Sequence, residues 1–193
     1  MRKLIVLLAA VALGAAGCGG NDESEPSGAG GQSLATGQVP FDRAFIDAMV
    51  PHHRSAIEMA REAMDAGLTQ PELVNIADAI VTGQQIEIDQ MLGWREQWFG
   101  SNKPGSEEDA LETLGLSAAE AGMEHGAMDL SMAEDVDQAF AEMMIAHHEG
   151  AIRMARLAAE RAGHVEVKTL AGEIIAAQQR EIDVMKEHAE GMH

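Results

Sequence analysis

The sequence predicts an all-α protein: a four-helix bundle of ferritin-like type, made of two repeated helical hairpins joined by a long crossover. Residues 45–61 and 140–156 match at an offset of 95 (140 − 45), each with Phe, Met, a His-His pair, Ile, Met, Ala and Arg in the same order. A second match, between residues 84–91 and 178–185, has an offset of 94 (178 − 84). The composition is 46% hydrophobic but only 3% aromatic, with 13 Met, which suits closely packed helices better than a sheet. Two related hairpins packed face to face would bury the apolar surface that neither hairpin covers alone.

The first helix is expected over residues 41–66. Apolar residues recur at helical spacing around Met49, and Gly67 follows them as a stop signal. His52 and His53 border this apolar face, so both imidazoles are expected to be directed towards the core. Five charged residues fall on the opposite side and are expected to face solvent: Arg43, Asp47, Arg54, Glu58 and Arg61.

The second helix is expected to begin at a capping box formed by Thr69 and Glu72, with Pro71 in its first turn, and to end near Gly100. The short connection to the first helix makes the two helices antiparallel. The apolar stripe expected to be buried consists of Leu73, Ile76, Ala77, Ile80, Met91, Trp94 and Trp98.

The third helix is expected to be capped by Ser131 together with Glu134, and the fourth to cover about residues 165–190. The connection over residues 101–130 is too long for a simple bundle loop. It contains a predicted short helix at residues 106–114 and is long enough to run the length of the bundle, as the single crossover of ferritin-like folds does.

The N-terminus predicts export. Two basic residues precede an apolar run that is too short to span a bilayer, and Ala-Ala-Gly then precedes Cys18, the only cysteine. This pattern resembles a bacterial lipoprotein signal with Cys18 as the lipidated residue; the alternative, an ordinary secretory signal, also exports the chain. The Gly- and Ser-rich residues that follow suit a flexible tether. The expected division is a signal peptide at 1–17, a tether at 18–38 and a bundle domain at 39–193, with repeat one at 41–99, the crossover at 100–130 and repeat two at 131–193.

The formal net charge of −19 at pH 7 restricts the partners of the protein. A surface this acidic repels nucleic acid and anionic lipid and raises the local concentration of cations. We therefore expect no nucleic-acid partner, and contact with the membrane only through the lipid anchor.

Histidine, glutamate, glutamine and methionine recur in both halves on faces that are expected to meet in the interior. Any one of them could be an ordinary core residue, because an inward His is often only hydrogen-bonded and a Met stripe often only fills space. Together they would bury many polar groups, which cost about 1–3 kcal/mol each when unpaired, whereas a bound cation would satisfy them collectively. The predicted metal ligands are His52, His53, His147, His148, Met49, Met144, Met59 and Met154. The residues predicted to orient these ligands from behind are Glu87, Glu181, Gln84 and Gln178.

The residue types at this site indicate which metal it would prefer. Thioether and imidazole without thiolate suit copper, as Cu(I) or Cu(II), or silver; iron and zinc are less favoured. Because imidazole must be neutral to bind, affinity is expected to fall below about pH 6. A second candidate metal site, which could equally be amphipathic Met at the start of a helix, consists of Met123, His125, Met128, Met132, Met185 and His188.

Two other functions are compatible with the helical pattern. A ferritin-like di-metal redox enzyme would need Glu-x-x-His on two helices, but this spacing occurs only at residues 190–193. The other alternative is a structural bundle of the cell envelope whose polar core binds no ligand. We therefore assign no catalytic residue and do not expect an enzyme.

The strings at residues 45–60 and 140–155, with the twice-used His-His and Gln-Gln-x-Glu-Ile-Asp patterns, resemble a bacterial ferritin-like family, the domain of unknown function numbered three hundred and five. That family includes CopM-like periplasmic copper-binding proteins. The resemblance covers about residues 41–188 and implies a four-helix bundle in the cell envelope that binds copper or silver through Met and His. It implies no catalytic activity. The resulting hypothesis is an extracytoplasmic, lipid-anchored protein that sequesters copper or passes it to an accepting envelope protein.

Overall fold

The computed structural model of the protein describes residues 40–123 and 130–189. These residues form helices and no strand, which confirms the predicted all-α class. The predicted signal peptide and tether, including Cys18, lie outside the described residues. The elements in chain order are α1 (Phe41–Ala66), α2 (Pro71–Phe99), α3 (Glu107–Leu114), the 3₁₀ turn η1 (Leu130–Met132), α4 (Val136–Arg161) and α5 (Val165–Ala189).

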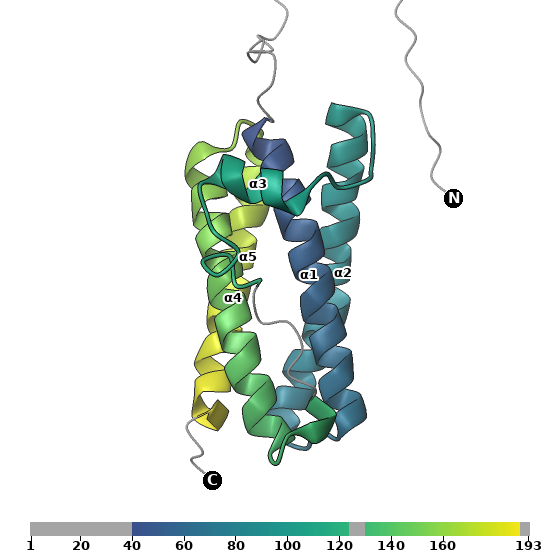
Figure 1. Cartoon of the computed structure of the whole chain (residues 1–193), viewed down its shortest axis with the longest axis vertical. Helices are drawn as coiled ribbons and strands as arrows, with labels where there is room; N and C mark the ends of the chain where they lie inside the picture. Colours follow the sequence, from purple (N-terminus) through teal and green to yellow (C-terminus); the bar gives the residue numbers. More distant parts are fainter. Residues whose placement is uncertain (1–39, 124–129, 190–193) are drawn as a thin grey trace, which may run out of the picture. The chain divides into compact units, whose positions relative to one another are not determined.

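The four long helices form two antiparallel hairpins, α1 with α2 and α4 with α5 (Figure 1). Helices α1 and α4 make the main contact between the hairpins, whereas α2 and α5 touch much less. The helices that carry the His-His pairs are therefore the two at the centre of the bundle. No described helix is long and apolar enough to cross a membrane.

The described parts of the crossover lie near the two ends of the bundle and beside α1 and α4 (Figure 1). Helix α2 ends at one end of the bundle, α3 packs against α1 near that end, and η1 lies near the opposite end, where α4 begins (Figure 1). The predicted short helix is present as α3, and Ser106 caps it by accepting a hydrogen bond from the Asp109 backbone N–H at 3.3 Å. Gly67 ends α1 with a φ of +103°, which a residue with a side chain rarely adopts.

The predicted capping box at the start of α2 is wrong. The N-cap position is Gln70, and its side chain makes no capping hydrogen bond. Instead the Asp137 carboxylate of α4 accepts hydrogen bonds from the backbone N–H groups of Thr69 and Gln70, both at 2.9 Å, and from the Thr69 hydroxyl at 2.6 Å. A carboxylate from the other hairpin thus replaces the local cap that Glu72 was expected to complete.

The predicted cap of the third long helix is also wrong. Ser131 lies inside η1, and α4 begins later, at Val136. The capping side chain is Asp135, which accepts a hydrogen bond from the Gln138 backbone N–H at 3.0 Å. Asp is as good an N-cap as Ser, so local sequence preference did not distinguish the two starts.

Asp47, expected to face solvent, is instead 3% exposed. Its carboxylate forms an ion pair with Arg95 of α2, at 2.5 Å between Oδ1 and Nε, and Arg95 is itself 2% exposed. Trp94 and Trp98, expected in the buried stripe, are only half-buried. The other members of that stripe are buried as predicted: Leu73, Ile76, Ala77, Ile80 and Met91.

Candidate metal centre

All four doublet histidines lie in the interior, each with at most 2% of its surface exposed. His52 and His53 come from α1, and His147 and His148 from α4, because each pair follows a buried Met by one helical turn on the core-facing side. The rings of His52 and His147 approach to 3.7 Å between centroids, with 38° between their planes. Imidazoles from the two repeats therefore meet at the contact between α1 and α4.

The second histidine of each doublet, His53 or His148, pairs with a carboxylate of its own hairpin. His53 Nε2 donates to Glu87 Oε2 at 2.7 Å, and His148 Nε2 donates to Glu181 Oε2 at 2.7 Å. Both histidine side chains are fully buried, whereas both Glu side chains are 21% exposed. In a neutral ring each pair places the proton on Nε2 and leaves the lone pair on Nδ1, as commonly found for metal-bound imidazoles.

His52 is held in a different way. Its Nε2 donates to the backbone carbonyl of Ala121, in the crossover, at 2.9 Å. Burial holds the pKa of His52 well below its usual value of 6.5, and His53 and His148 lower it further because a second positive charge beside them is unfavourable. The bond to Ala121 opposes this shift but is the smallest of these effects. His52 is therefore neutral at pH 7, with its proton on Nε2 and a lone pair on Nδ1.

Several buried acceptor atoms of this region have no hydrogen-bond partner among the described residues. Three of them are Nδ1 atoms, belonging to His52, His53 and His148, and two are the side-chain oxygens of Gln84 and Gln178. Unpaired buried groups of this kind cost about 1–3 kcal/mol each. Since all five are lone-pair acceptors, a cation or a hydrogen-bond donor is what would satisfy them.

The predicted methionine ligands are also in the core. Met49 and Met144 precede His52 and His147 by three residues and are completely buried. The two methionines that follow the doublets, Met59 and Met154, are 8% and 0% exposed.

Carboxylate and imidazole alone do not complete a metal site in the part of the chain that the structure describes. No three His, Cys, Asp or Glu side chains in residues 40–123 and 130–189 are placed to hold one ion together. A metal held here would need ligands of other kinds, and methionine sulfur and glutamine oxygen are the ones at hand.

The described members of the second candidate set differ in burial. Met185 is completely buried, Met123 is half-buried against the core, and Met132 is 81% exposed. His188 is half-buried near the end of α5. His125 and Met128 lie outside the described residues.

Two contacts close to the histidines escaped the sequence analysis. The Ala121 carbonyl is a backbone group, and no residue type marks it as a partner of His52. Arg153 of α4 donates through Nε to the Glu120 carbonyl at 2.6 Å, next to Ala121 in the crossover. One usable signal was present in the sequence, because a glycine, Gly150, stands inside α4 where the first repeat has Ser55 (150 − 95).

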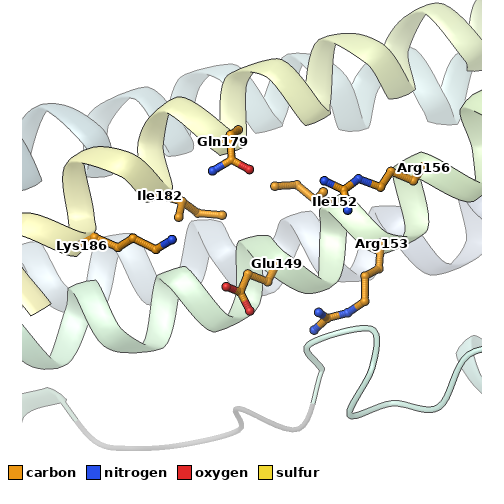
Figure 2. A pocket seen from close by; sticks show the side chains of 7 residues that line it. All are labelled: Glu149, Ile152, Arg153, Arg156, Gln179, Ile182 and Lys186. Atoms are coloured by element: carbon orange, nitrogen blue, oxygen red, sulfur yellow. The ribbon is translucent and has the colours of Figure 1, made fainter.

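A groove of about 260 Å³ is lined by residues of α4 and α5 (Figure 2). Ile152 and Ile182 form its apolar part, and Arg153, Arg156 and Lys186 contribute positive charge. None of the predicted ligands lines the groove. It is therefore distinct from the buried histidines.

A helical bundle in which each of two hairpins supplies a buried, carboxylate-paired His-His doublet is the class of protein that the fold and the site define. The chain belongs to the family described as domain of unknown function DUF305, whose sequence profile matches residues 42–189. A comparison with curated protein sequences found no match.

Solved structures of CopM and of another DUF305 protein are similar to this chain in fold and sequence. CopM in its Cu(I)-bound form is 31% identical, with a TM-score of 0.63, over 79% of this chain and 97% of CopM. CopM in its Cu(II)-bound form is 33% identical, with a TM-score of 0.64, over 81% of this chain and 99% of CopM. A DUF305 protein from Streptomyces coelicolor is 25% identical, with a TM-score of 0.64, over 76% of this chain and 90% of that one. The chain thus spans nearly the whole of these relatives.

Proposed function

We propose that this protein binds copper or silver in the interior of its bundle and sequesters the metal or passes it on. The observation that carries the proposal is the set of buried acceptor atoms without partners among the described residues: Nδ1 of His52, His53 and His148 and the side-chain oxygens of Gln84 and Gln178. These atoms come from both hairpins, and a single kind of ligand, a cation, would satisfy them together.

The donor types favour a soft metal. Imidazole nitrogen and thioether sulfur are available, thiolate is not, and Met49 and Met144 lie one turn from the histidines. Solved structures of CopM include Cu(I)-bound, Cu(II)-bound and Ag-bound forms, at 31–33% identity to this chain. Iron and zinc suit this donor set less well.

The residues would then divide their roles as follows. The doublet histidines supply imidazole ligands, at most two of them to one ion in the described arrangement, and the sulfurs of Met49, Met144, Met59 and Met154 complete the coordination. Glu87 and Glu181 fix the ring orientation and tautomer of His53 and His148. The side-chain oxygens of Gln84 and Gln178 are further lone-pair donors available to the metal.

The place of action that we propose is the cell envelope. The N-terminal basic and apolar run would export the chain, and Cys18 would carry the lipid that holds it at the membrane. An envelope protein that accepts the metal would be its partner. Labelling of Cys18 with a fatty-acid analogue in cells, and loss of labelling in Cys18→Ala, would test the anchor.

Competition titration tests metal binding directly. Purified protein is titrated with Ag(I), or anaerobically with Cu(I), against a weak chelator, beside the double variant His52→Ala/His147→Ala. The wild type should take metal from the chelator, and the double variant should lose most of this affinity. Gln85→Ala/Gln179→Ala, which changes exposed neighbours of Gln84 and Gln178, is the matched control and should bind as the wild type does.

Native mass spectrometry of the same samples, loaded in parallel with Zn(II) and Fe(II), measures selectivity and stoichiometry. Preferential retention of Cu(I) or Ag(I) is expected. A wild type that takes no metal from the chelator, or a double variant that binds as tightly as the wild type, would disprove the proposal.

A further inference from the structure

The crossover touches the histidine centre through its backbone. Ala121 is completely buried, and its carbonyl oxygen accepts the hydrogen bond from His52 Nε2 at 2.9 Å. A carbonyl oxygen can only accept, so this contact requires a proton on Nε2 of His52. The remaining nitrogen, Nδ1, is the one left without a partner among the described residues.

Two glycines allow the crossover to come this close. A Cβ added to Gly150 of α4 would lie 2.1 Å from the Ala121 carbonyl oxygen and 2.5 Å from the Gly122 nitrogen, both far inside van der Waals contact. Gly122 has a φ of +71°, and a Cβ there would lie 3.0 Å from the Ala146 carbonyl oxygen. The two backbones therefore touch directly, with no side chain between them.

The internal repeat shows that this glycine serves the crossover. The counterpart of Gly150 in α1 is Ser55 (150 − 95), which is exposed, whereas Gly150 is buried. The residues around the two positions otherwise keep the same pattern of His, Ile, Met, Ala and Arg. Glycine inside a helix is less stable than a residue with a side chain, so its presence here needs a compensating contact.

Arg153 of α4 also binds the crossover, next to Ala121. Arg153 Nε donates to the Glu120 carbonyl oxygen at 2.6 Å, and Figure 2 shows Arg153 reaching from α4 towards the crossover. The counterpart of Arg153 in α1 is Glu58 (153 − 95), which cannot donate in this way. The second repeat thus differs from the first at these two positions, both of which contact the crossover.

We propose that the crossover is a positioning element of the metal centre: the Ala121 carbonyl holds His52 in the Nε2–H form, and Gly150 and Arg153 keep that carbonyl in place. His52 thereby presents Nδ1 to the metal, as Glu87 and Glu181 make His53 and His148 do. The inference rests on the proposed function. It adds that the tautomer of His52 is set by a backbone group of the crossover, whereas those of His53 and His148 are set by carboxylates.

The test first measures the tautomer of His52 in metal-free protein and then measures the affinity for Ag(I). Long-range ¹H–¹⁵N correlation spectra of metal-free protein should show His52 in a single Nε2–H form. In Gly150→Ala the new methyl group displaces Ala121, so the His52 signals should shift or report mixed tautomers. Affinity for Ag(I) in the same variant should fall by about 10–100-fold, the usual effect of removing an outer partner of a metal ligand.

Matched substitutions in α1 control for the change of residue itself. Ser55→Ala places alanine at the repeat-equivalent position, where a Cβ is already present, and should leave both the tautomer and the affinity unchanged. If Gly150→Ala does not fold, Arg153→Gln decides, with Glu58→Gln as its control. Arg153→Gln removes the bond to Glu120 and should shift the His52 signals in the same direction by a smaller amount.

The outcomes separate the two proposals. A wild type that binds no Ag(I) overturns the proposed function, whatever the tautomer. If the wild type binds Ag(I) but its metal-free His52 carries the proton on Nδ1, the positioning role is wrong. It is equally wrong if Gly150→Ala and Arg153→Gln both keep the wild-type tautomer and affinity.

Discussion

The rings of His52 and His147 lie 3.7 Å apart between centroids, although 95 residues separate them in the chain (147 − 52). They occupy the same position of the two repeats, so the pseudo-symmetry of the bundle brings like residue against like. Two imidazoles at this distance cannot both carry a positive charge in a buried site without strong repulsion. The contact is compatible with neutral rings, which is the form that binds metal.

Removal of the carboxylates of Glu87 and Glu181 should weaken metal binding without unfolding the bundle. In Glu87→Gln/Glu181→Gln the side chains keep their size but lose the charge that orients His53 and His148. Ag(I) affinity, measured by chelator competition, should fall by about 10–100-fold. The control is Asp89→Asn, an acid-to-amide change on the exposed side of α2, which should leave affinity unaltered. Equal affinity in the double variant and the wild type would show that these carboxylates are not involved.

Metal should also stabilise the folded protein. A ligand that binds only the folded state at 100 times its dissociation constant contributes about 2.7 kcal/mol. For a domain of this size each kcal/mol raises the Tm by roughly 2–4 °C, so we expect a shift of about 5–10 °C in thermal melts with Ag(I). His52→Ala/His147→Ala should melt at the same temperature with and without Ag(I). A Tm shift of the same size in that variant would mean that the metal binds elsewhere.

The lowered pKa of His52 makes stability depend on pH. Below about pH 6.5 the unfolded chain takes up a proton that the folded chain excludes at this position, so stability falls as the pH is lowered towards the folded pKa. The contribution is fully present above pH 6.5, and its slope is at most about 1.4 kcal/mol per pH unit. Urea unfolding between pH 7.5 and pH 5 should therefore show a shallower pH dependence for His52→Gln than for the wild type.

The same shift refines the sequence-based expectation for metal affinity. An unperturbed histidine would begin to lose metal to protons near pH 6. Because burial keeps His52 neutral to lower pH, proton competition at this ligand should begin below that value. Ag(I) titrations at pH 7, 6 and 5 measure the onset.

The helices and the burial of the doublets were predictable from the sequence because both follow from periodicity. A residue three positions after Met49 or Met144 shares its face, and the repeat provides the same evidence twice. The contacts that were missed depend on the tertiary structure. The capping of Thr69 by Asp137 joins residues 68 apart, and the bond of His52 to Ala121 uses a backbone atom. Neither contact leaves a local signal in residue type or spacing.

The burial of Asp47 also depends on the tertiary structure. Its position on the charged face of α1 predicted that the side chain would be exposed. Helical periodicity gives the direction of a side chain relative to its own helix, but not what the next helix places beside it. Here Arg95 of α2 supplies a buried countercharge, and its Nη1 also donates to the Ser101 carbonyl oxygen at 2.5 Å. A paired charge can be buried where a single one cannot.

That ion pair gives a prediction for stability that is independent of metal. Arg95→Met leaves the Asp47 carboxylate buried with only the weaker contact to Arg43, at 3.4 Å, and should cost about 3–5 kcal/mol in urea unfolding. The double variant Asp47→Leu/Arg95→Met removes both charges and should recover much of that loss, since apolar pairs often replace buried ion pairs at little cost. Arg43→Met, at a half-exposed position, is the control and should cost less than about 1 kcal/mol. If Arg95→Met costs no more than Arg43→Met, the Asp47–Arg95 pair contributes little, and the hairpin of α1 and α2 is held by its apolar stripe alone.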